Sequence, residues 1–442
     1  MIGLANSVSD IIDQAPASST ILVAYSGGVD SHVLLHVCSG LKGVYPNKNI
    51  QAVYIDHGLH KDSPQWRDHC EAIASSLRIE FLSEKVHAAN INGDGPEQAA
   101  RNARYAALAL LVNSGTLLLT AQHQDDQAET LMLQLLRGAG AKGLASMPTL
   151  AAFGDGCIGR PFLSISQQEV MDYATVNELC WIDDPSNLDT SLDRNYLRQQ
   201  VIPLIKKRWP AFAKTTSRTA SHCAEATDIL SSYGSTFLSG RPDEISLELF
   251  QQVKPNVCRL ILREWMLLND TRLPSEKVLN QILVLATKKI GSSGLVEWSD
   301  YQVRLFNQRF FLFKKVLDRP ATTPTIWPNT ELTLRTSIGL LKRTPVLGFG
   351  LSRKTWMSSE VSVRYRMGGE KIRLAKGVGH RPVKKLLSER KIFPWQRQHI
   401  PLIYFGERLV AVANLWVADE FSVNKGELGF ELEWVHSGAR IC

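Results

Sequence analysis

Residues 20–31 decide the fold of this chain, and they read Thr-Ile-Leu-Val-Ala-Tyr-Ser-Gly-Gly-Val-Asp-Ser. The apolar run from Thr20 to Tyr25 is typical of a buried parallel strand, and residues 30–38 carry the apolar spacing of a helix. Gly27 and Gly28 allow the backbone to turn sharply and to approach a phosphate group closely. The following helix offers unpaired N–H groups and the positive end of its dipole to that anion. The stretch therefore predicts a strand, a phosphate-binding loop and a helix.

The side chains of this loop fit the same interpretation. Ser26 and Ser31 supply hydroxyl donors, whereas Asp30 repels an anion and is better suited to holding Mg²⁺ or ordering the loop. The Walker pattern Gly-x-x-x-x-Gly-Lys is absent at this position, so the loop belongs to another class of nucleotide site. An ordinary glycine-rich turn with a serine cap is the alternative. The predicted ATP-binding residues are Ser26, Gly27, Gly28, Val29, Asp30 and Ser31.

The first 140 residues or so alternate strand and helix patterns. Further strands are predicted at 50–55, 79–82 and 116–121, each separated from the next by one helix. This spacing predicts a parallel sheet covered by helices on both faces. Ligands of such sheets bind at the carboxyl ends of the strands, where the glycine loop, Asp56-His57-Gly58 and His123-Gln124-Asp125-Asp126 all fall.

His123, Asp126 and Glu129 form a second candidate cluster, at the start of the helix that follows the fourth strand. Asp126 and Glu129 are three residues apart, so a helix places both carboxylates on one face of its first turn. His123 adds a group that titrates near neutrality. Together they could bind an ammonium group and remove its proton. A capping box without catalytic use is the alternative, because Asp-x-x-Glu is common at helix starts.

Arg101 and Arg104 lie on one face of the preceding helix. Arginines at this edge of the sheet could stabilise charge on a phosphoryl group during its transfer. A surface salt bridge is an equal alternative for Arg104 and a weaker one for Arg101.

In the remainder of the chain the predicted secondary structure changes twice. Residues 209–289 are helical and amphipathic, and residues 295–317 predict a strand pair. A stretch rich in proline and threonine at 319–325 is typical of a linker. The last 100 residues or so alternate in polarity and predict a small mixed α/β domain. We therefore expect three domains: a parallel-sheet α/β catalytic domain at 1–215, a mainly helical domain at 216–325, and a basic C-terminal domain at 345–442.

Charge is concentrated near the C-terminus. Residues 361–400 hold eleven lysines and arginines against two glutamates, so this segment is +9 within a chain of net charge +7. A compact basic region on a chain that is otherwise close to neutral favours a nucleic-acid partner, although a solvated basic surface is the alternative.

The seven cysteines are scattered and never paired as C-x-x-C, which disfavours a disulfide framework, a zinc ribbon and an iron–sulfur site. No apolar run approaches the roughly 18 residues of a membrane span, and the N-terminus lacks the basic flank of a secretory signal. We expect a cytoplasmic protein without a membrane partner and with reduced thiols.

The phosphate loop resembles that of the PP-loop family of ATP pyrophosphatases, enzymes that cleave ATP between the α- and β-phosphates and adenylate a substrate. The ordered set of motifs is similar to one branch in particular, the tRNA(Ile)-lysidine synthetases. Gln122 stands where that branch often has glycine, a minor departure. The matching pieces cover nearly the whole chain and are Ser26–Ser31, Asp56–Leu59, Glu97 with Arg101 and Tyr105, His123–Thr130, Arg137–Leu144, Arg160–Leu163, Asp183–Asn187, Arg194 with Asn195 and Arg198, Val363–Glu370, Phe393–Arg397 and Ile400–Leu402.

The resemblance implies a ligase that uses ATP and Mg²⁺. ATP would adenylate the C2 oxygen of the wobble cytidine in an isoleucine tRNA with a CAU anticodon. The ε-amine of free L-lysine would then displace AMP to give lysidine, changing codon reading from AUG to AUA. The implied catalytic residues are Asp30, Arg101, His123, Asp126 and Glu129, with Asp30 also a candidate Mg²⁺ ligand.

Candidate tRNA contacts are basic residues of the matching motifs and of the C-terminal segment. Trp395 could stack on an unpaired base, with a buried core position as the favoured alternative. The assembly state is open, a homodimer being one option. The candidate contacts are Arg194, Arg198, Arg364, Arg366, Lys384, Lys385 and Arg397.

Three other functions fit parts of the pattern. A tRNA thiolase of the same superfamily needs reactive or cluster-binding cysteines, which the scattered thiols disfavour. A synthetase coupled to an amidotransferase needs an ammonia source, and no Cys/His glutaminase pattern accompanies the loop. A non-catalytic RNA-binding module could use the basic terminus alone, but it would not need the phosphate loop.

Overall fold

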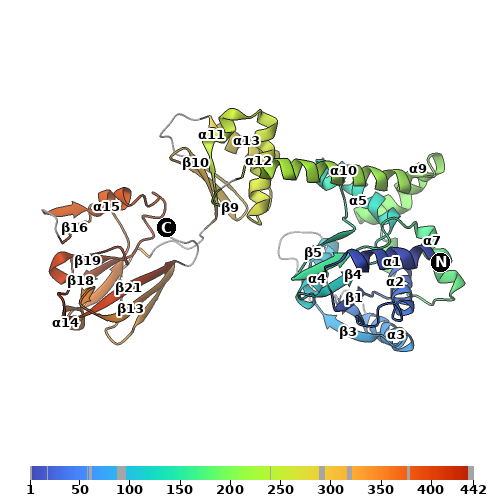
Figure 1. Cartoon of the computed structure of the whole chain (residues 1–442), viewed down its shortest axis with the longest axis horizontal. Coiled ribbons are helices and arrows are strands. Elements are labelled where there is room, and N and C mark those ends of the chain that lie inside the picture. The colour runs from blue at the N-terminus through green and yellow to red at the C-terminus, as the bar shows by residue number, and fades with distance from the viewer. Residues whose placement is uncertain are drawn as a thin grey trace. The chain divides into compact units, whose positions relative to one another are not determined.

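The computed structural model describes residues 2–16, 18–56, 58, 62–86, 96–238, 240–287, 294–315, 321–375 and 379–436. The chain forms two compact units, Met1–Tyr233 and Gly234–Cys442 (Figure 1). His57, Leu59 and Lys376, which the sequence patterns included, lie outside the described residues. The predicted domain limits at 215/216 and between 325 and 345 stay predictions.

A six-stranded sheet forms the centre of the first unit, with strand order β3-β2-β1-β4-β6-β5. Every neighbouring pair is parallel except β5 with β6, which is antiparallel. The predicted parallel α/β fold is thus confirmed, and β5 and β6 extend the sheet beyond the strands that the sequence pattern indicated. The strands are β1 Thr20–Ala24, β2 Asn49–Asp56, β3 Glu80–Lys85, β4 Thr116–Leu119, β5 Leu150–Phe153 and β6 Gly156–Gly159.

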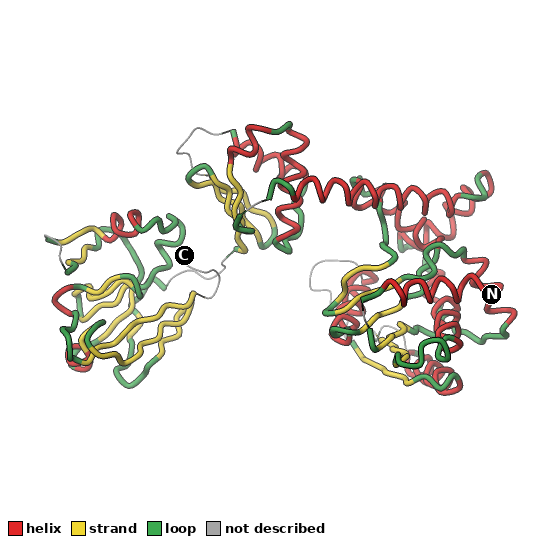
Figure 2. The backbone as a smooth tube through the Cα atoms, in the orientation of Figure 1, coloured by secondary structure: helices red, strands yellow, loops and turns green. Residues whose placement is uncertain are grey.

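Successive side chains of a strand point to opposite faces of the sheet, and apolar side chains on both faces give this sheet a hydrophobic core on each side. On β1, Ile21 and Val23 pack with residues of α1, α2 and α7, whereas Leu22 and Ala24 pack with residues of α4. Helices and strands follow one another through this unit in Figure 2. The helices are α1 Ile2–Gln14, α2 Val29–Gly40, α3 Ser63–Ser76, α4 Pro96–Leu111, α5 Gln124–Leu136, α6 Ala141–Leu144, α7 Gln167–Val176, α8 Asp193–Tyr196, α9 Ile202–Arg208 and α10 Phe212–Ser235, with a 3₁₀ turn at Pro185–Leu188 and a π-helical turn at Leu197–Val201.

The strand order reverses direction between β1 and β4. From β1 the chain goes outward through β2 to β3, then returns to place β4 on the other side of β1. The loops after β1 and β4 therefore leave the same edge of the sheet and diverge, which opens a crevice there. Those loops carry the glycines and the His123 cluster, so the topology brings the two predicted site segments together.

In the second unit, a four-stranded antiparallel sheet, β7-β10-β9-β8, packs against α12 and α13 through one hydrophobic core. Residues 295–317, for which the sequence predicted a strand pair, hold three strands of this sheet, because two short turns divide the segment. β7 was not predicted, because its three residues are too short to show alternation. The elements are β7 Glu244–Ser246, α11 Leu247–Gln252, α12 Pro255–Leu268, α13 Glu276–Ala286, β8 Gly294–Trp298, β9 Tyr301–Phe306 and β10 Arg309–Lys314.

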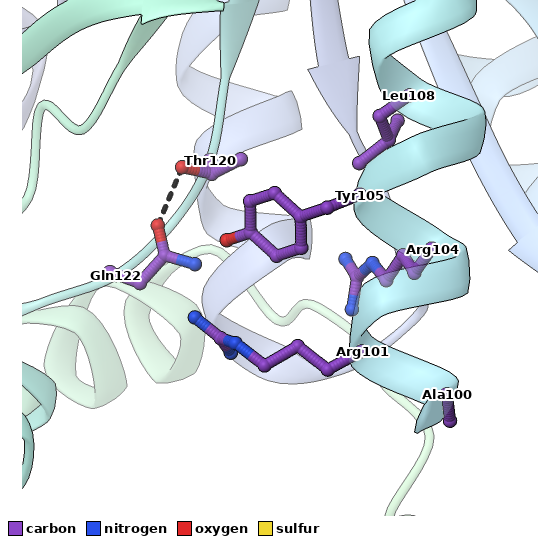
Figure 3. Close-up of a pocket in the computed structure, with 7 residues that line it drawn as sticks. All are labelled: Ala100, Arg101, Arg104, Tyr105, Leu108, Thr120 and Gln122. Carbon is purple, nitrogen blue, oxygen red and sulfur yellow. Dashed lines mark hydrogen bonds between the residues drawn. The ribbon is translucent and has the colours of Figure 1, made fainter. Parts of the chain in front are cut away.

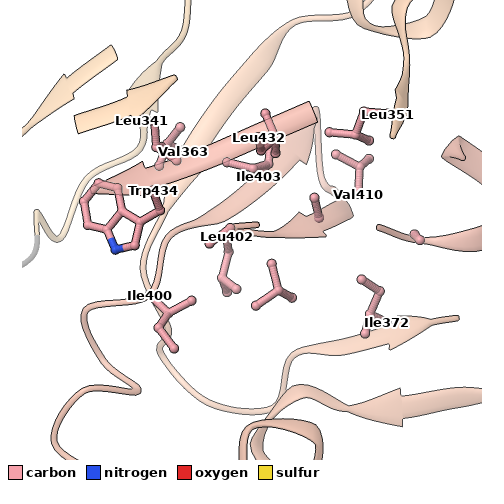
Figure 4. Packing of buried hydrophobic residues seen from close by; sticks show 14 of the residues in the cluster. Leu341, Leu351, Val363, Ile372, Ile400, Leu402, Ile403, Val410, Leu432 and Trp434 are labelled. Atoms are coloured by element: carbon pink, nitrogen blue, oxygen red, sulfur yellow. The ribbon is translucent and has the colours of Figure 1, made fainter. Parts of the chain in front are cut away.

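The C-terminal part of this unit is β-rich, with two larger sheets, a two-stranded one and two short helices, as the predicted mixed domain requires. Its core contains Trp327, Trp356 and the aliphatic side chains drawn in Figure 4. The elements are β11 Thr325–Ile326, β12 Thr333–Thr336, β13 Gly339–Leu347, β14 Leu351–Ser352, α14 Arg353–Met357, β15 Val361–Arg364, β16 Lys371–Arg373, β17 His380–Pro382, α15 Val383–Glu389, β18 Leu402–Phe405, β19 Arg408–Val412, β20 Trp416–Val417, the 3₁₀ turn Asp419–Phe421 and β21 Leu428–His436.

Two expectations drawn from composition can be compared with the structure. Among the described residues, every helix is too short or too polar to cross a membrane. The described cysteines, which are all of them except Cys442, are free thiols.

Leu118 tests the sheet core. Its side chain is fully buried in β4, so Leu118→Ala should lower the free energy of unfolding of the first unit by about 2–5 kcal/mol. Leu110→Ala is the matched control, because Leu110 of α4 is 89% exposed and its loss should change stability by less than about 0.5 kcal/mol. Denaturant titration of both variants measures the difference, and equal stability would contradict the described core.

Candidate active site

The phosphate loop follows β1 and depends on the conformational freedom of Gly27. Gly27 has φ +86°, in the left-handed region that side chains other than glycine rarely adopt. Its carbonyl accepts a hydrogen bond from the N–H of Ile182 at 2.9 Å. A Cβ atom at this position would lie 2.8 Å from Cδ1 of Ile182 and 3.0 Å from Sγ of Cys70. Backbone conformation and packing both require glycine at position 27.

The loop serines stabilise the turn and leave the start of α2 open. Ser31 Oγ donates to the carbonyl of Gly28 at 2.9 Å and accepts from the N–H of Ser26 at 3.2 Å. Gly28 is the N-cap of α2, and no side chain caps that end of the helix. The first N–H groups of α2 are therefore available to an anion, whose charge the helix dipole favours.

Two neighbouring pockets lie at this edge of the sheet. One, of about 170 Å³, is lined by the loop after β1, by Arg104, by residues 120–122 after β4, and by Asp126 and Arg194. The other, of about 190 Å³, has Arg101, Arg104 and Tyr105 of α4 pointing toward Thr120 and Gln122 (Figure 3). Arg104, Thr120 and Gln122 line both pockets. They form one polar crevice next to the phosphate loop.

Arg101 and Arg104 supply cations to this crevice. The guanidinium of Arg101 lies 5.0 Å from the ring centre of Tyr105, and neither arginine forms an ion pair with a carboxylate of the described residues. Burial lowers the pKa of Arg104 and outweighs the favourable charge of Tyr105. Surface salt bridging, one explanation for Arg104, is thus not seen within the described part of the chain. Arg101 is exposed and Arg104 is desolvated, and two cations without carboxylate partners among the described residues favour an anionic ligand.

His123 caps α5 and holds Asp126 in place. Its Nδ1 accepts the N–H of Asp126 at 3.4 Å, while Asp126 Oδ2 accepts the N–H of His123 at 3.0 Å. Nε2 of the buried ring lies 3.4 Å from Oδ2 of Asp126 and 3.8 Å from Oδ2 of Asp30. Because Nδ1 is used as an acceptor, this network requires Nε2 to carry the proton. The capping box pairs His123 with Asp126, and not Asp126 with Glu129 as the Asp-x-x-Glu spacing offered. The His123 ring also connects α5 to the phosphate loop.

Asp126 and Glu129 both contact two arginines from the segment after α7. Arg194 bonds Asp126 at 2.9 Å and Glu129 at 2.8 Å. Arg198 bonds the same two carboxylates at 2.9 Å and 2.5 Å. Burial raises the pKa of Asp126, but the electrostatic attraction of His123 and the positive charges of Arg194 and Arg198 outweigh burial and lower it. Asp126 is thereby held ionised.

Asp30 lies at the border between the phosphate loop and this cluster. Its pKa is raised by burial and by the charges of Asp126 and Glu129, which His123 and Arg198 only partly offset. Its Oδ1 is buried and has no hydrogen-bond partner among the described residues. The carboxylates of Asp30, Asp126 and Glu129 lie near the guanidiniums of Arg194 and Arg198. Three negative groups thus face two positive ones, and the site has room for further positive charge.

Lys206 of α9 contacts the N-terminal end of α5. Its Nζ bonds Oδ1 of Asp125, and Oδ2 of Asp125 accepts the N–H of Gln167 at 3.0 Å. Burial would raise the pKa of Asp125, but the bonds from Lys206 and Gln167 lower it. Lys206 was not among the predicted site residues. Lys206, Arg194 and Arg198 belong to a stretch, residues 194–224, that contains no aspartate or glutamate, a signal that could have identified them.

The predicted tRNA contacts are divided between the two units. Arg194 and Arg198 contact the carboxylates just described. In the second unit, Arg364 pairs with Glu407 at 2.8 Å, and Arg366 lies 3.5 Å from Glu370 in a half-buried position. Nε of Arg397 donates to the carbonyl of Ile392 at 2.8 Å. Lys384 and Lys385 of α15 are exposed. Their role in binding RNA stays a prediction.

Trp395 belongs to an aromatic cluster. Its ring stacks parallel on Phe393 with centroids 4.9 Å apart, and Phe311 lies 6.2 Å away. The guanidinium of Arg304 lies 5.1 Å from the Trp395 ring centre. These contacts occupy the ring, which supports the packing role over base stacking.

Comparison with known proteins agrees with this geometry. Residues 4–205 match the family described as PP-loop domain, residues 245–311 the TilS substrate binding domain, and residues 361–434 the TilS substrate C-terminal domain. The tRNA(Ile)-lysidine synthase of Methylococcus capsulatus is 35% identical over 94% of this chain and 96% of its own length. That of Coxiella burnetii is 36% identical over 94% of this chain and 93% of its own length.

The chain belongs to the tRNA(Ile)-lysidine synthase family.

Membership of the lysidine synthase family agrees with the way the site is divided along the chain. The PP-loop match includes both the loop after β1 and the Asp126–Glu129 cluster, so the nucleotide pocket and the carboxylates lie in one matched segment. The two substrate-domain matches fall in the second unit, which holds the basic segment. ATP use follows from the PP-loop domain.

Gly27→Ala tests the phosphate loop. The left-handed conformation and the contact with Ile182 should cost about 1–2 kcal/mol of stability and weaken ATP binding. Gly140→Ala is the matched control, because Gly140 has φ −78° and a Cβ atom added there would meet nothing within 4 Å. Thermal unfolding and ATP titration measure both effects. If Gly27→Ala bound ATP as tightly as Gly140→Ala, the described loop geometry would be wrong.

Proposed function

We propose that this chain joins lysine to the wobble cytidine of a CAU-anticodon isoleucine tRNA in two steps. In the first, the C2 oxygen of the cytidine attacks the α-phosphorus of ATP and pyrophosphate leaves. In the second, the ε-amine of lysine attacks C2, the C2–O bond breaks, and AMP leaves with the oxygen. The product is lysidine, which changes codon reading from AUG to AUA.

One observation carries this proposal. The phosphate loop and the Asp126–Glu129 cluster are in direct contact, because His123 Nε2 lies 3.4 Å from Asp126 and 3.8 Å from Asp30. A nucleotide on the loop and an amine at the carboxylates would therefore be held side by side. Such proximity is what transfer of an adenylated base to an amine requires.

The residues around the pocket fit the adenylation step. The N–H groups at the start of α2 and the hydroxyls of Ser26 and Ser31 would hold the departing pyrophosphate. Arg101 and Arg104 would stabilise the negative charge that develops at the α-phosphate. Asp30 fits Mg²⁺, since its buried Oδ1 has no partner among the described residues and carboxylate oxygen is a preferred ligand. Bound there, Mg²⁺ would neutralise charge on the leaving phosphates.

The carboxylate cluster fits the lysine step. With Asp30 assigned to Mg²⁺, Asp126 and Glu129 are the carboxylates that would bind an ε-ammonium group. Because Arg194 and Arg198 already bond both carboxylates, lysine would enter by sharing or displacing one guanidinium. His123 would keep Asp126 oriented through the cap, and loss of the ammonium proton to this cluster would free the amine for attack.

The remaining partners follow from charge and family. Exposed Lys384 and Lys385 would contact tRNA phosphates, a contribution that does not depend on sequence and weakens with salt. We place the reaction in the cytoplasm, and a homodimer stays one option for the assembly.

A thiolase is the main alternative, and its chemistry has less support. Among the described residues, no group of three or more histidine, cysteine, aspartate or glutamate side chains is arranged to hold a metal ion or cluster. Cys38 and Cys70 are buried, and burial raises the pKa of each to about 12, which disfavours the reactive thiolate.

Comparing Glu129→Gln with Asp30→Asn tests whether Glu129 serves the lysine step and Asp30 the adenylation step. Glu129→Gln should leave most tRNA adenylation intact but slow transfer to lysine by 100-fold or more. Loss of one charge that binds the ammonium group should cost about 3 kcal/mol, which corresponds to a factor of this size. Asp30→Asn should reduce both steps, because adenylation precedes transfer. Adenylate formation is followed by pyrophosphate release with ³²P-labelled ATP, and transfer by labelled lysine.

Glu84→Gln, on the exposed edge of β3, is the control for the loss of a charge. Melting temperatures exclude unfolding as the cause. If Glu129→Gln impaired both steps equally, Glu129 would not belong to the lysine site.

A further inference from the structure

A second basic surface lies next to the carboxylate cluster, in the first unit of the chain. Residues 194–224 contain seven lysines and arginines and no aspartate or glutamate. Three of the seven, Arg194, Arg198 and Lys206, bond the carboxylates of α5. The other four are exposed and form no ion pair with the described carboxylates; they are Lys207, Arg208, Lys214 and Arg218.

Trp209 is exposed in the middle of this surface. It ends α9, and 63% of its area is accessible to solvent. The guanidinium of Arg208 lies 6.0 Å from its ring centre, and no other described aromatic ring packs against it. A large aromatic side chain is seldom left this open, since its burial stabilises a fold by a few kcal/mol, roughly 1.5–3. The open ring is therefore available to a partner.

The position of Trp209 connects it to the site. Lys206, three residues earlier in the chain, bonds Asp125, which precedes the carboxylate Asp126. Three residues of helix advance about 4.5 Å along the axis, so α9 carries the chain from the carboxylates to Trp209 within one turn. A polymer whose reacting base lies between the phosphate loop and the lysine at the carboxylates would have its neighbouring nucleotides within reach of α9.

We propose that Trp209 is the stacking platform for an unpaired base of the RNA substrate, next to the base that is modified. Exposed Lys207, Arg208, Lys214 and Arg218 would bind the phosphates on either side. Single-stranded RNA is recognised by this combination, in which aromatic rings stack on splayed bases and cations follow the backbone. Charge decides against a protein partner, because a surface with four unpaired cations and no carboxylate needs a polyanion. The inference rests on the proposed function, which supplies the RNA.

The test uses the full-length protein with Trp209→Ala and Trp209→Phe. We expect Trp209→Ala to weaken binding of the isoleucine tRNA transcript by about 5- to 150-fold, the range for loss of one stacked base. Trp209→Phe should recover most of that loss. Leu204→Ala is the control, because Leu204 is a 71% exposed apolar residue on the same helix and should leave RNA affinity unchanged. ATP affinity should be the same in all four proteins.

Two further readouts separate stacking from charge. Trp209 neutralises no phosphate, so Trp209→Ala should leave the salt dependence of binding unchanged, whereas replacing Lys207 and Arg208 together should reduce its slope by about 1.4. A tRNA transcript with an abasic nucleotide beside the wobble position should bind wild type and Trp209→Ala equally, because the base that stacks is missing.

The outcomes are distinct. If wild type formed lysidine but Trp209→Ala bound the intact tRNA as tightly as wild type, the stacking role would be refuted while the proposed function stood. The stacking role would also be refuted if Trp209→Ala weakened binding of intact tRNA and of the abasic transcript by the same factor. If wild type modified no tRNA, the proposed function itself would fail.

Discussion

The adjacency of β1 and β4 in a parallel sheet is the constraint on which the rest of the site depends. Because the strand order reverses between them, the loops that leave their carboxyl ends must open onto one crevice. One loop offers helix N–H groups to phosphate, and the other begins a helix with His123, Asp126 and Glu129. Segments that are 90 residues or so apart in the chain thus meet at the contact between His123 and Asp30.

Electrostatics then determines what this crevice can hold. On one side, Arg101 and Arg104 lack carboxylate partners among the described residues and favour an anion. On the other, Asp126 is kept ionised beside two guanidiniums that also bond Glu129, and Asp30 adds a carboxylate whose pKa is raised by burial. Opposite charge requirements a few ångströms apart suit a reaction that joins a phosphorylated species to an amine. Removing one partner of such a buried ion-pair network typically costs about 3–5 kcal/mol, because the remaining charge is left buried without a partner.

Local rules made the parallel fold, the phosphate loop and the α5 cluster predictable. Gly27, the helix after it and the placement of His123, Asp126 and Glu129 at the start of α5 each follow from a few neighbouring residues. The capping partner of Asp126 is His123 and not Glu129, which the Asp-x-x-Glu spacing had offered. The ion pairs of Arg194 and Arg198 could not be predicted in this way, because their partners lie 65 to 72 residues earlier in the chain. The same limit applies to Trp395, whose packing depends on Phe311 and Phe393, and to β7, which is too short to carry a pattern.

The central claim is that the phosphate loop and the carboxylate cluster act in sequence on one tRNA base. Incubation of the full-length protein with ATP, labelled lysine and transcripts of the CAU-anticodon isoleucine and methionine tRNAs tests it most directly, with the modified nucleoside identified by mass spectrometry. The account predicts one lysine per isoleucine tRNA at the wobble position, dependent on ATP, with AMP and pyrophosphate released in equal amounts. Incorporation without ATP, or no lysine at the wobble cytidine despite ATP cleavage, would contradict it.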